Sequence, residues 1–577
     1  MTAGAAGQGS ENRAGTSGHP WLKSYPRDVT WAQRFPAKPV YDLLDEAVRK
    51  HGHKPCTHFL GKVLSYAEIR ELVDRASAGL QRIGVDKGSR VGLFLPNSPT
   101  YVIYYFAILK IGGTVVNYNP LYTLEELTHQ IKDSQTDLFI TLDLKILFDK
   151  VEALLKSGTL ARAVVCSFPH LLPAAKSILF RLLKGRELGA PGRSEVSSQI
   201  VLESRLMAND GVHSRPTLDP LNDIAVLQYT GGTTGTPKGA MLTHANLYIN
   251  ALQLISWAPG LKDGEERVMA VLPFFHVFAM TVVMNFAVAK AAQMIIMPRF
   301  ALADALKLID ETKPTAMPGV PTLFNAMLNY SELKRYDLSS LKFCFSGGAP
   351  LPVEVKQRFE ELTGCALVEG YGLSETSPVL TANQLNGPVK AGSIGQPIPG
   401  TTISLRDLAD PTREVPLGER GELCAAGPQI MKGYWNQPQE TTSQFVGEFF
   451  RTGDVAVMDE DGYLYIVDRI KDLIICSGYN VYPRRVEEAI YTHPAVEEVT
   501  VIGIPDKYRG EAPKAFIKLK SGMQATREEI LSHLAPKLSR IEMPAQIEFR
   551  DQLPKTMIGK LSKKELRTEE ARYKANA

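Results

Sequence analysis

The sequence lacks the features of several large classes of protein. Its 577 residues include only six cysteines, which stand singly without a CxxC pair: Cys56, Cys166, Cys344, Cys365, Cys424 and Cys476. This spacing excludes a disulfide framework or a Cys/His zinc site, and it predicts reduced thiols in a cytosolic protein. The net charge is only +3, from 65 basic and 62 acidic residues, and no strongly basic domain is present. We therefore expect no nucleic-acid partner.

Secretory and membrane-spanning segments are lacking as well. Residues 1–20 are mostly Gly, Ala, Ser and Thr without a continuous apolar run, which predicts a disordered leader and not a signal peptide. The longest apolar stretch, residues 268–289, is interrupted by Pro273, His276 and Asn285. It therefore predicts a buried strand, a turn and a core helix and not a bilayer span. These features predict a cytoplasmic protein.

One segment does indicate contact with a membrane surface. Residues 170–187 combine large apolar side chains with four basic ones: Leu179, Phe180, Leu182 and Leu183 with Lys176, Arg181, Lys184 and Arg186. A basic amphipathic helix of this kind lies on anionic lipid. The alternative, a surface helix that packs its apolar side on the domain, is the interpretation that the sequence alone favours.

The apolar fraction of 44% predicts a large core divided among two or three domains. Helical periodicity over residues 66–84 and 101–111 alternates with apolar strands at 91–95 and 114–117, which predicts a helix-covered, mainly parallel sheet. From about Gly392 the chain turns to short strands with Gly/Pro turns. We therefore predict an α/β protein with an N-terminal domain at 21–469, a β-rich subdomain at about 392–469, and a small α+β domain at 470–577.

The strongest chemical signal is the loop YTGGTTGTPKGAML, which begins at Tyr229 after an apolar strand. Its glycines and threonines can turn amides and hydroxyls toward an anion, and Lys238 adds a full charge. Pro237-Lys238-Gly239 stands where a P-loop has Gly-Lys-Ser/Thr, so a P-loop ATPase or kinase is disfavoured.

Two further glycine clusters follow predicted strands. Residues 346–350 read SGGAP, and glycines there permit close approach by a flat ligand such as a base. Residues 369–376 read EGYGLSET, where Glu375 offers the oxygen donor that Mg²⁺ prefers. The second cluster lacks the last glycine of a nucleophile elbow and the third glycine of a dinucleotide fingerprint.

Together these motifs resemble the adenylate-forming superfamily of acyl-CoA synthetases, luciferases and adenylation domains. Within it, the chain is most similar to bacterial long- or medium-chain fatty-acyl-CoA ligases, from about Trp21 to about Leu566. The resemblance implies two steps: a fatty acid and ATP form acyl-adenylate and pyrophosphate, and CoA then takes the acyl group with release of AMP. It implies ATP, Mg²⁺ and CoA as the small-molecule partners, and a homodimer is compatible with it.

The resemblance also implies a role for each matching position. The β- and γ-phosphates of ATP would be held by Thr230, Gly231, Gly232, Thr233, Thr234, Gly235, Thr236 and Lys238. The adenine would be surrounded by Gly347, Gly348, Ala349, Pro350, Tyr371 and Gly372. Ser374 takes a phosphate-contacting position that is usually threonine in the family. Glu375 would hold Mg²⁺, and Asp454 and Arg469 would bind the ribose.

The remaining implied roles concern catalysis and domain motion. Lys560 would reach the α-phosphate and the substrate carboxylate, and His276 would line the carboxylate site. Lys471 would be the hinge, and Gly478 would let CoA approach in the second step. Read without the family, Lys560 is equally a solvated tail lysine, His276 a hydrogen-bonded core residue, and Asp454 with Arg469 a salt bridge.

Several alternatives stay open at this point. The apolar stretches 277–289 and 319–324 suit an acyl tunnel, yet aromatic acids need equally apolar pockets. Transfer of the acyl group to a carrier protein is a further alternative within the class. A catalytically silent nucleotide-binding protein and a light-emitting oxygenase are compatible with the same fold.

Overall fold

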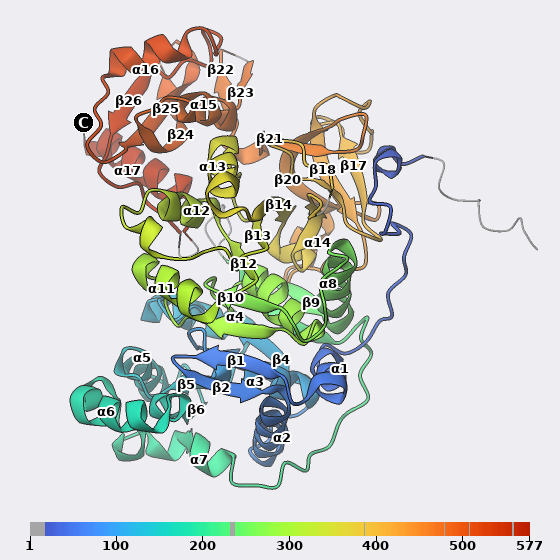
Figure 1. The fold of residues 1–577 in the computed structure, drawn as a ribbon, viewed down its shortest axis with the longest axis vertical. Helices are drawn as coiled ribbons and strands as arrows, with labels where there is room; N and C mark the ends of the chain where they lie inside the picture. Colours follow the sequence, from blue (N-terminus) through green and yellow to red (C-terminus); the bar gives the residue numbers. More distant parts are fainter. Residues whose placement is uncertain are drawn as a thin grey trace, which may run out of the picture.

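The protein is built on four β-sheets, as a computed structural model shows (Figure 1). The structure describes residues 18–230, 237–385, 387–477, 479–506, 508–556 and 559–576. Two large sheets form the N-terminal body, a small antiparallel sheet forms a subdomain beside it, and a fourth sheet forms the C-terminal domain. The predicted α/β architecture is confirmed.

The first large sheet has seven strands in the order β7-β6-β5-β3-β4-β8-β9. All neighbours are parallel except β8 and β9, which form an antiparallel hairpin. The strands are β3 (Arg90–Leu93), β4 (Thr114–Asn117), β5 (Leu138–Leu142), β6 (Arg162–Cys166), β7 (Ile200–Leu202), β8 (Ile224–Thr230) and β9 (Lys238–Thr243). The helices between them are α3 (Pro99–Lys110), α4 (Leu124–Ser134), α5 (Lys145–Lys156), α6 (Ala174–Lys184) and α7 (Glu203–Leu206).

The second large sheet has nine strands in the order β16-β15-β14-β13-β12-β10-β11-β1-β2, parallel in its middle and antiparallel at both ends. The strands are β1 (Pro55–Phe59), β2 (Lys62–Ser65), β10 (Arg267–Ala270), β11 (Gln293–Ile296), β12 (Ala316–Gly319), β13 (Phe343–Ser346), β14 (Ala366–Gly372), β15 (Val379–Ala382) and β16 (Gln396–Pro397). Its helices are α1 (Asp42–His51), α2 (Tyr66–Arg82), α8 (His244–Trp257), α11 (Leu302–Thr312), α12 (Pro321–Leu328) and α13 (Val353–Thr363). Residues from both large sheets share one apolar core.

Local sequence explains where the predicted elements begin and end. Helix α2 begins after Ser65, whose hydroxyl and backbone pair with Glu68 in a capping box, and Gly84 follows its end with φ +84°. Residues 268–289 form the expected strand, turn and helix, with a π-helical turn η6 (Met280–Asn285) between α9 (Val277–Ala279) and α10 (Phe286–Ala289). No helix among the described residues is long and apolar enough to cross a bilayer.

The β-rich subdomain forms a five-stranded antiparallel sheet in the order β17-β18-β20-β19, with β21 paired to β20. The strands are β17 (Thr402–Arg406), β18 (Gly421–Ala426), β19 (Phe445–Val446), β20 (Phe449–Met458) and β21 (Leu464–Arg469), with α14 (Pro438–Ser443) between β18 and β19. Near the predicted start at Gly392 the chain contacts two sheets: Gly395 forms a bridge with Leu464 of β21, and Gln396 and Pro397 pair with β15 of the nine-stranded sheet.

The N-terminal segment differs in part from the predicted leader. Residues 1–17 lie outside the described residues, whereas Pro20–Lys23 form a 3₁₀ turn. Trp21 is buried in the core of the β-rich subdomain, and His19 stacks on its ring at 4.5 Å. The folded chain therefore includes His19 and Pro20, because the large apolar indole carries its neighbours into the subdomain.

The C-terminal domain has its own apolar cores and a five-stranded sheet in the order β23-β22-β25-β24, with β26 paired to β25. The strands are β22 (Ile474–Cys476), β23 (Tyr479–Val481), β24 (Val496–Asp506), β25 (Gly510–Leu519) and β26 (Gln546–Phe549). The helices are α15 (Pro483–Tyr491), α16 (Arg527–Leu534) and α17 (Lys563–Asn576). A 3₁₀ turn, η9 (Ile470–Asp472), joins this domain to β21.

Helix α6 corrects the interpretation of residues 170–187 that the sequence favoured. None of its residues is buried, and Ile178, Leu179, Leu182 and Leu183 are 54–77% exposed. The apolar side does not pack on the domain, because Phe180 on the other side of the helix contacts Phe168 instead.

Candidate active site

A carboxylate, a guanidinium and a phenol meet at the edge of the β-rich subdomain, next to the 3₁₀ turn η9. Asp454 on β20 and Arg469 on β21 are register partners, and Arg469 Nε lies 3.1 Å from Asp454 Oδ1. The hydroxyl of Tyr371, on β14, donates to the other carboxylate oxygen of Asp454 at 2.5 Å. Asp454 is buried, and it raises the pKa of Arg469. Three of the predicted site residues are thus brought into contact.

Lys560 reaches this cluster from the C-terminal domain. The neighbouring Gly559 accepts a hydrogen bond at its carbonyl from the Thr322 hydroxyl, at 2.7 Å, and Thr322 lies at the start of α12. Gly559 has φ +82°, a conformation that favours glycine, and a Cβ there would lie 3.1 Å from the Thr322 oxygen, which is a tight contact. Arg469 and burial lower the pKa of Lys560 to about 7. Lys560 is half-buried and is not a fully solvated tail lysine.

His276 lies within electrostatic range of Lys560 and caps helix α9. Its Nδ1 accepts from the backbone N–H of Phe278 at 3.3 Å. Burial, and then Lys560, lower the pKa of His276 to about 4. The ring is therefore neutral at pH 7, and Nε2 carries its proton.

The turn η9 adds another cation to the same region. Lys471 lies in η9, and its pKa is lowered to about 8 by burial and by Arg469. Arg469 thus disfavours the charged forms of both Lys471 and Lys560. Such a cluster is suited to receive anions, which would relieve the repulsion.

Glu375 is connected to Lys238 through a residue that the motifs did not reveal. The Tyr434 hydroxyl donates to Glu375 Oε1 at 2.8 Å, and the ammonium of Lys238 lies 5.3 Å from the centre of the Tyr434 ring. Lys238 also pairs with Glu440 on α14. Glu375 and Ser374 share the short turn η8 (Ser374–Thr376) after β14, and Ser374 is half-buried there.

Glu375 also meets the requirements of a Mg²⁺ ligand in such a site. Among the residues that the structure describes, no group of three or more His, Cys, Asp or Glu side chains is placed to hold a metal ion. A single protein carboxylate is nevertheless sufficient where substrate phosphates and water complete the coordination of Mg²⁺. The residues present therefore fit a metal held jointly with a phosphate ligand.

The two glycine clusters on β13 and β14 approach each other closely. A Cβ at Gly370 would lie 2.2 Å from the Phe345 ring, and one at Gly347 would lie 3.1 Å from the Phe278 ring. Gly348, exposed at the end of β13, has φ +79°, and it is followed by the half-buried Ala349 and the exposed Pro350. A Cβ at Gly372 would clash with the Pro378 carbonyl at 1.7 Å. These glycines serve close packing as well as ligand access.

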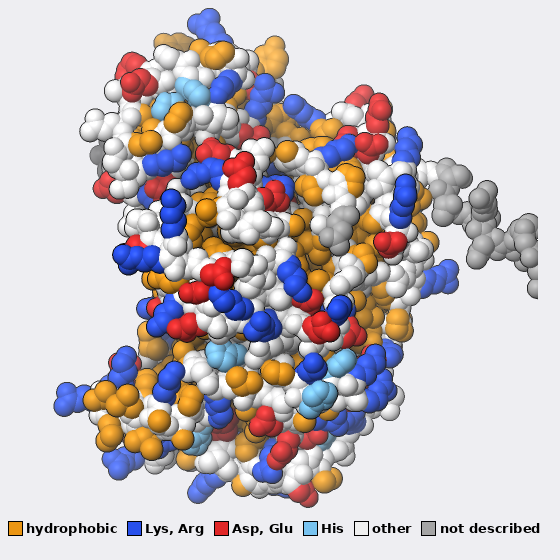
Figure 2. All heavy atoms as spheres, in the orientation of Figure 1, with side chains coloured by type: hydrophobic (Ala, Val, Ile, Leu, Met, Phe, Trp, Pro, Cys, Tyr) orange, Lys and Arg blue, Asp and Glu red, His pale blue; other side chains and the backbone are white. Residues whose placement is uncertain are grey.

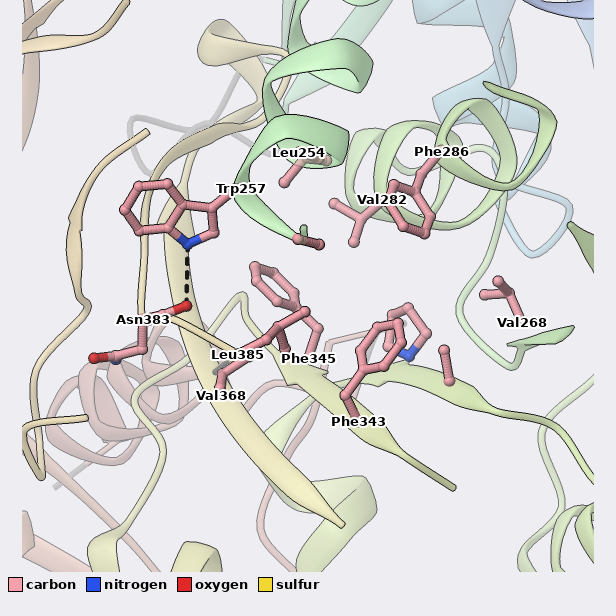
Figure 3. A pocket seen from close by; sticks show the side chains of 13 residues that line it. Leu254, Trp257, Val268, Val282, Phe286, Phe343, Phe345, Val368, Asn383 and Leu385 are labelled. Atoms are coloured by element: carbon pink, nitrogen blue, oxygen red, sulfur yellow. Dashed lines mark hydrogen bonds between the residues drawn. The ribbon is translucent and has the colours of Figure 1, made fainter. Parts of the chain in front are cut away.

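An apolar cavity adjoins the Phe345 side chain that packs on Gly370 (Figure 3). Phe345 forms part of its wall and contacts Phe278, two residues after His276. Asn383, whose carbonyl accepts from Trp257 Nε1 at 3.1 Å, contributes a polar group to a lining that is otherwise almost entirely apolar. The labelled wall residues include Leu254, Trp257, Val282, Phe286, Phe343, Phe345 and Val368. The cavity is a narrow slot of about 40 Å³.

This cavity only partly matches the stretches predicted for an acyl tunnel. Val282 and Phe286 come from the predicted stretch 277–289, whereas the lining includes Pro318 and no residue of 319–324. Thr322, in that second stretch, instead contacts the Lys560 loop. Trp257, which also lines the cavity, lies on α8, and no sequence motif indicated that this helix contributes to the site.

Some predicted site residues lie outside the described residues: Gly231, Gly232, Thr233, Thr234, Gly235 and Thr236, and also Gly478. The ends of the first loop are described. Thr230 and Lys238 are register partners of the β8–β9 hairpin, so the loop joins two antiparallel strands. The predicted anion-binding loop therefore connects the two strands of a hairpin.

The chain belongs to the AMP-binding enzyme family. The family matches residues 44–435, and the AMP-binding enzyme C-terminal domain matches residues 485–560. The long-chain-fatty-acid–CoA ligase of Bacillus subtilis (strain 168) is 43% identical over 551 residues, which cover 96% of this chain and 98% of the relative.

Solved structures agree in fold and in domain arrangement. The anthranilate CoA ligase AuaEII in complex with anthranoyl-AMP matches with a TM-score of 0.81 at 26% identity, over 94% of this chain and 99% of that one. ATP-bound MatB from Rhodopseudomonas palustris matches with 0.80 at 29% identity, over 93% and 100%. The apo form of MatB matches with a TM-score of 0.72 at 29% identity.

Proposed function

We propose that this protein is an ATP-dependent fatty-acid–CoA ligase that works through an acyl-adenylate. One arrangement carries the proposal: Lys560 lies within electrostatic range of Arg469, Asp454 and His276. Phe278, two residues after His276, contacts Phe345 in the wall of an apolar cavity. Cations beside an apolar slot suit a substrate with an anionic head and an apolar tail. The similarity to a long-chain-fatty-acid–CoA ligase over nearly the whole chain supports the same assignment.

In the first step, a carboxylate oxygen of the fatty acid attacks the α-phosphorus of ATP. An acyl–O–P bond forms, the bond to the β-phosphate breaks, and pyrophosphate leaves. Two anions must approach each other, so cationic groups placed at the reacting atoms lower the barrier. Lys560 contributes its ammonium between the carboxylate and the α-phosphate. Neutral His276 contributes an N–H donor toward the carboxylate.

The nucleotide would be held by residues from both sheets and the subdomain. The loop Thr230–Thr236 with Lys238 would take the β- and γ-phosphates, and Ser374 would add a hydroxyl. The glycine layer at 347–350, with Tyr371 and Gly372, would receive the adenine. Asp454 would accept from the ribose hydroxyls while Arg469 fixes its orientation.

Mg²⁺ would be bound by Glu375 together with ATP phosphates. When bound, it neutralises phosphate charge and so assists attack on the α-phosphorus. Tyr434 supports this role because its hydroxyl donates to Oε1 and so orients the Glu375 carboxylate.

In the second step, the thiolate of CoA attacks the acyl carbonyl. A C–S bond forms, the C–O bond to phosphate breaks, and AMP leaves. We infer that the C-terminal domain first turns about Lys471, which withdraws Lys560 and brings the segment around Gly478 to the site. The hinge suits this motion because η9 is a three-residue turn between two separately packed domains.

The apolar lining favours an acyl chain as the substrate tail, but the slot is narrow. A volume of about 40 Å³ holds only a few water molecules, so a long chain requires side chains such as Phe286 to change rotamer. Aromatic acids are the second candidate, because an anthranilate CoA ligase shares the fold at 26% identity. A homodimer is a further prediction, which light scattering on the purified protein tests.

The decisive experiment is a pyrophosphate-release assay over acids of increasing chain length and aromatic acids, with and without CoA. We expect release with long and medium fatty acids, and CoA-dependent release of AMP. Aromatic preference would support the second candidate. Pyrophosphate release followed by acyl transfer only to a carrier protein would mean that the carrier protein, and not CoA, accepts the acyl group. No pyrophosphate release with any acid would overturn the proposal.

A further inference from the structure

Helix α6 presents a continuous aliphatic surface to solvent. Ile178, Leu179, Leu182 and Leu183 are 62%, 54%, 77% and 74% exposed. Their spacing of i, i+1, i+4 and i+5 places them on one face of the helix. The space-filling view shows this cluster as an orange patch with basic side chains at its edge, at the lower left where Figure 1 places α6 (Figure 2).

The helix is fixed to the protein by its other side. Phe180 packs on Phe168, with ring centroids 5.1 Å apart. At the N-terminal end, Lys176 Nζ donates to the Leu60 carbonyl at 2.9 Å in the hairpin between β1 and β2. The aliphatic face is therefore held outward by contacts on the opposite side.

An exposed face of this kind is costly unless something covers it. Burial of leucine and isoleucine side chains is strongly favourable, and contiguous apolar patches on soluble proteins mark interaction sites. Four such side chains on one short helix therefore indicate a partner surface.

The charges beside the face select the kind of partner. Arg181, Lys184 and Arg186 are exposed, and the acidic residue nearest in sequence, Glu187, pairs with Lys184 at 3.4 Å where both side chains are more than half exposed. The interaction energy of such an exposed ion pair is small, so Lys184 remains able to bind an anion. Together with Arg181 and Arg186 it makes the surroundings of the patch positively charged. Aliphatic side chains flanked by lysine and arginine match the acyl chains and anionic headgroups of a lipid surface.

We propose that α6 docks the protein on anionic membranes, with Ile178, Leu179, Leu182 and Leu183 among the acyl chains and the basic residues at the headgroups. The helix lies in the plane of the membrane surface and does not cross it. The proposal is independent of the ligase reaction, because docking is measured without substrate.

The test is co-sedimentation of the full-length protein with vesicles of one part phosphatidylglycerol to three parts phosphatidylcholine, and with vesicles of phosphatidylcholine alone. We expect binding to the anionic vesicles that falls with salt. The double variant Leu182→Ser/Leu183→Ser should lower the partition coefficient at least about tenfold. The control Val212→Ser/Leu221→Ser, which changes side chains 77% and 62% exposed elsewhere, should bind as the wild type does.

A second pair of variants separates charge from apolar insertion. Arg181→Gln/Lys184→Gln should lower binding to anionic vesicles by about tenfold or more, at roughly 1 kcal/mol for each basic residue. The matched control Lys262→Gln/Lys307→Gln, at exposed lysines distant in sequence, should lower it less than twofold. All variants are checked for folding by circular dichroism.

Three outcomes overturn the proposal. These are no vesicle binding by the wild type, equal binding to neutral and anionic vesicles, and equal losses in the α6 and control variants. Light scattering measures the oligomeric state and so tests the alternative that a second copy of the chain binds the aliphatic face of α6. If Leu182→Ser/Leu183→Ser converts a dimer to a monomer and leaves vesicle binding unchanged, α6 is an interface between copies and not a membrane surface.

Discussion

The two halves of the candidate site are held in place in different ways. The apolar cavity lies within the largest core of the described residues, with walls from α8, η6, α10 and the strands β10, β12, β13 and β14. Lys560 belongs to a domain with its own cores, docked through polar contacts such as Thr322 to Gly559, Asn325 to Glu497 and Arg484 to Ile466.

This difference suits two separate roles in the proposed mechanism: the cavity in the N-terminal core would select the acid, and Lys560 in the C-terminal domain would assist the reaction. A core wall resists change because each buried side chain contributes several kcal/mol, whereas a polar docking contact contributes about 0.5–1.5 kcal/mol. In the proposed mechanism, Lys560 would therefore be withdrawn at low cost without disturbing the core that surrounds the cavity.

The largest effect is expected from Lys560→Ala. It removes the cation between two anions, so pyrophosphate release should fall by about 10²–10³-fold or more. Conversion of supplied acyl-adenylate with CoA should continue, because that step uses the withdrawn position. Lys564→Ala, at an exposed lysine on α17, is the control and should stay within twofold. Normal pyrophosphate release by Lys560→Ala would remove Lys560 from the mechanism.

The pH dependence of the first step tests the environment of Lys560. With a pKa of about 7, Lys560 loses its charge as the pH rises, so kcat/KM for pyrophosphate release should fall about tenfold for each unit above 7. The fall in kcat should begin at higher pH, because bound phosphate and carboxylate favour the ammonium. In Lys560→Arg the residual activity should lack this alkaline fall, since guanidinium stays charged. The same alkaline limb in Lys560→Arg would assign the titration to another group.

Ala316→Leu tests the fixed half of the site. Ala316 is buried on β12 and lines the cavity, so a larger side chain narrows the slot. We expect kcat/KM for hexadecanoate to fall more than about tenfold relative to octanoate, which serves as the internal control. Ala316→Val should give an intermediate ratio. Equal losses for both acids would mean that the cavity is not the acyl site and that overpacking alone lowers activity.

Thr322→Val tests the contact that holds the Lys560 loop of the C-terminal domain against α12, and it should give the smallest effect. Removal of the hydroxyl that holds Gly559 should lower adenylation about threefold to tenfold, the equivalent of one hydrogen bond. The thioester step should be unchanged or faster, because the variant no longer favours the docked position. Thr322→Ser, which keeps the donor, is the matched control. A loss shared by both variants, or by both steps, would contradict a docking role.

Local pattern predicted much of the fold because it depends on neighbours in sequence. The helix at 66–82 and the strand at 114–117 follow from apolar periodicity and from stops at Gly84 and Gly112-Gly113. Asp454, Arg469, Tyr371 and Lys560 were identified through the family resemblance, and the structure places them together.

The remaining features depend on contacts between distant residues. Thr322 and Gly559 lie 237 positions apart, and Tyr434 meets Glu375 across 59 positions, so no local pattern links them. The orientation of α6 was also not predictable. Its amphipathic pattern fits an aliphatic face that points either into the domain or toward solvent. The contact of Phe180 with Phe168 holds that face toward solvent.

The position of α6 has a mechanical consequence. It lies near one end of the longest axis of the molecule, and the C-terminal domain lies at the other (Figure 1). A protein attached through α6 would stand on its N-terminal body with the hinge raised above the lipid. The moving domain would then complete each cycle in open water, and attachment and turnover would not compete for the same surface.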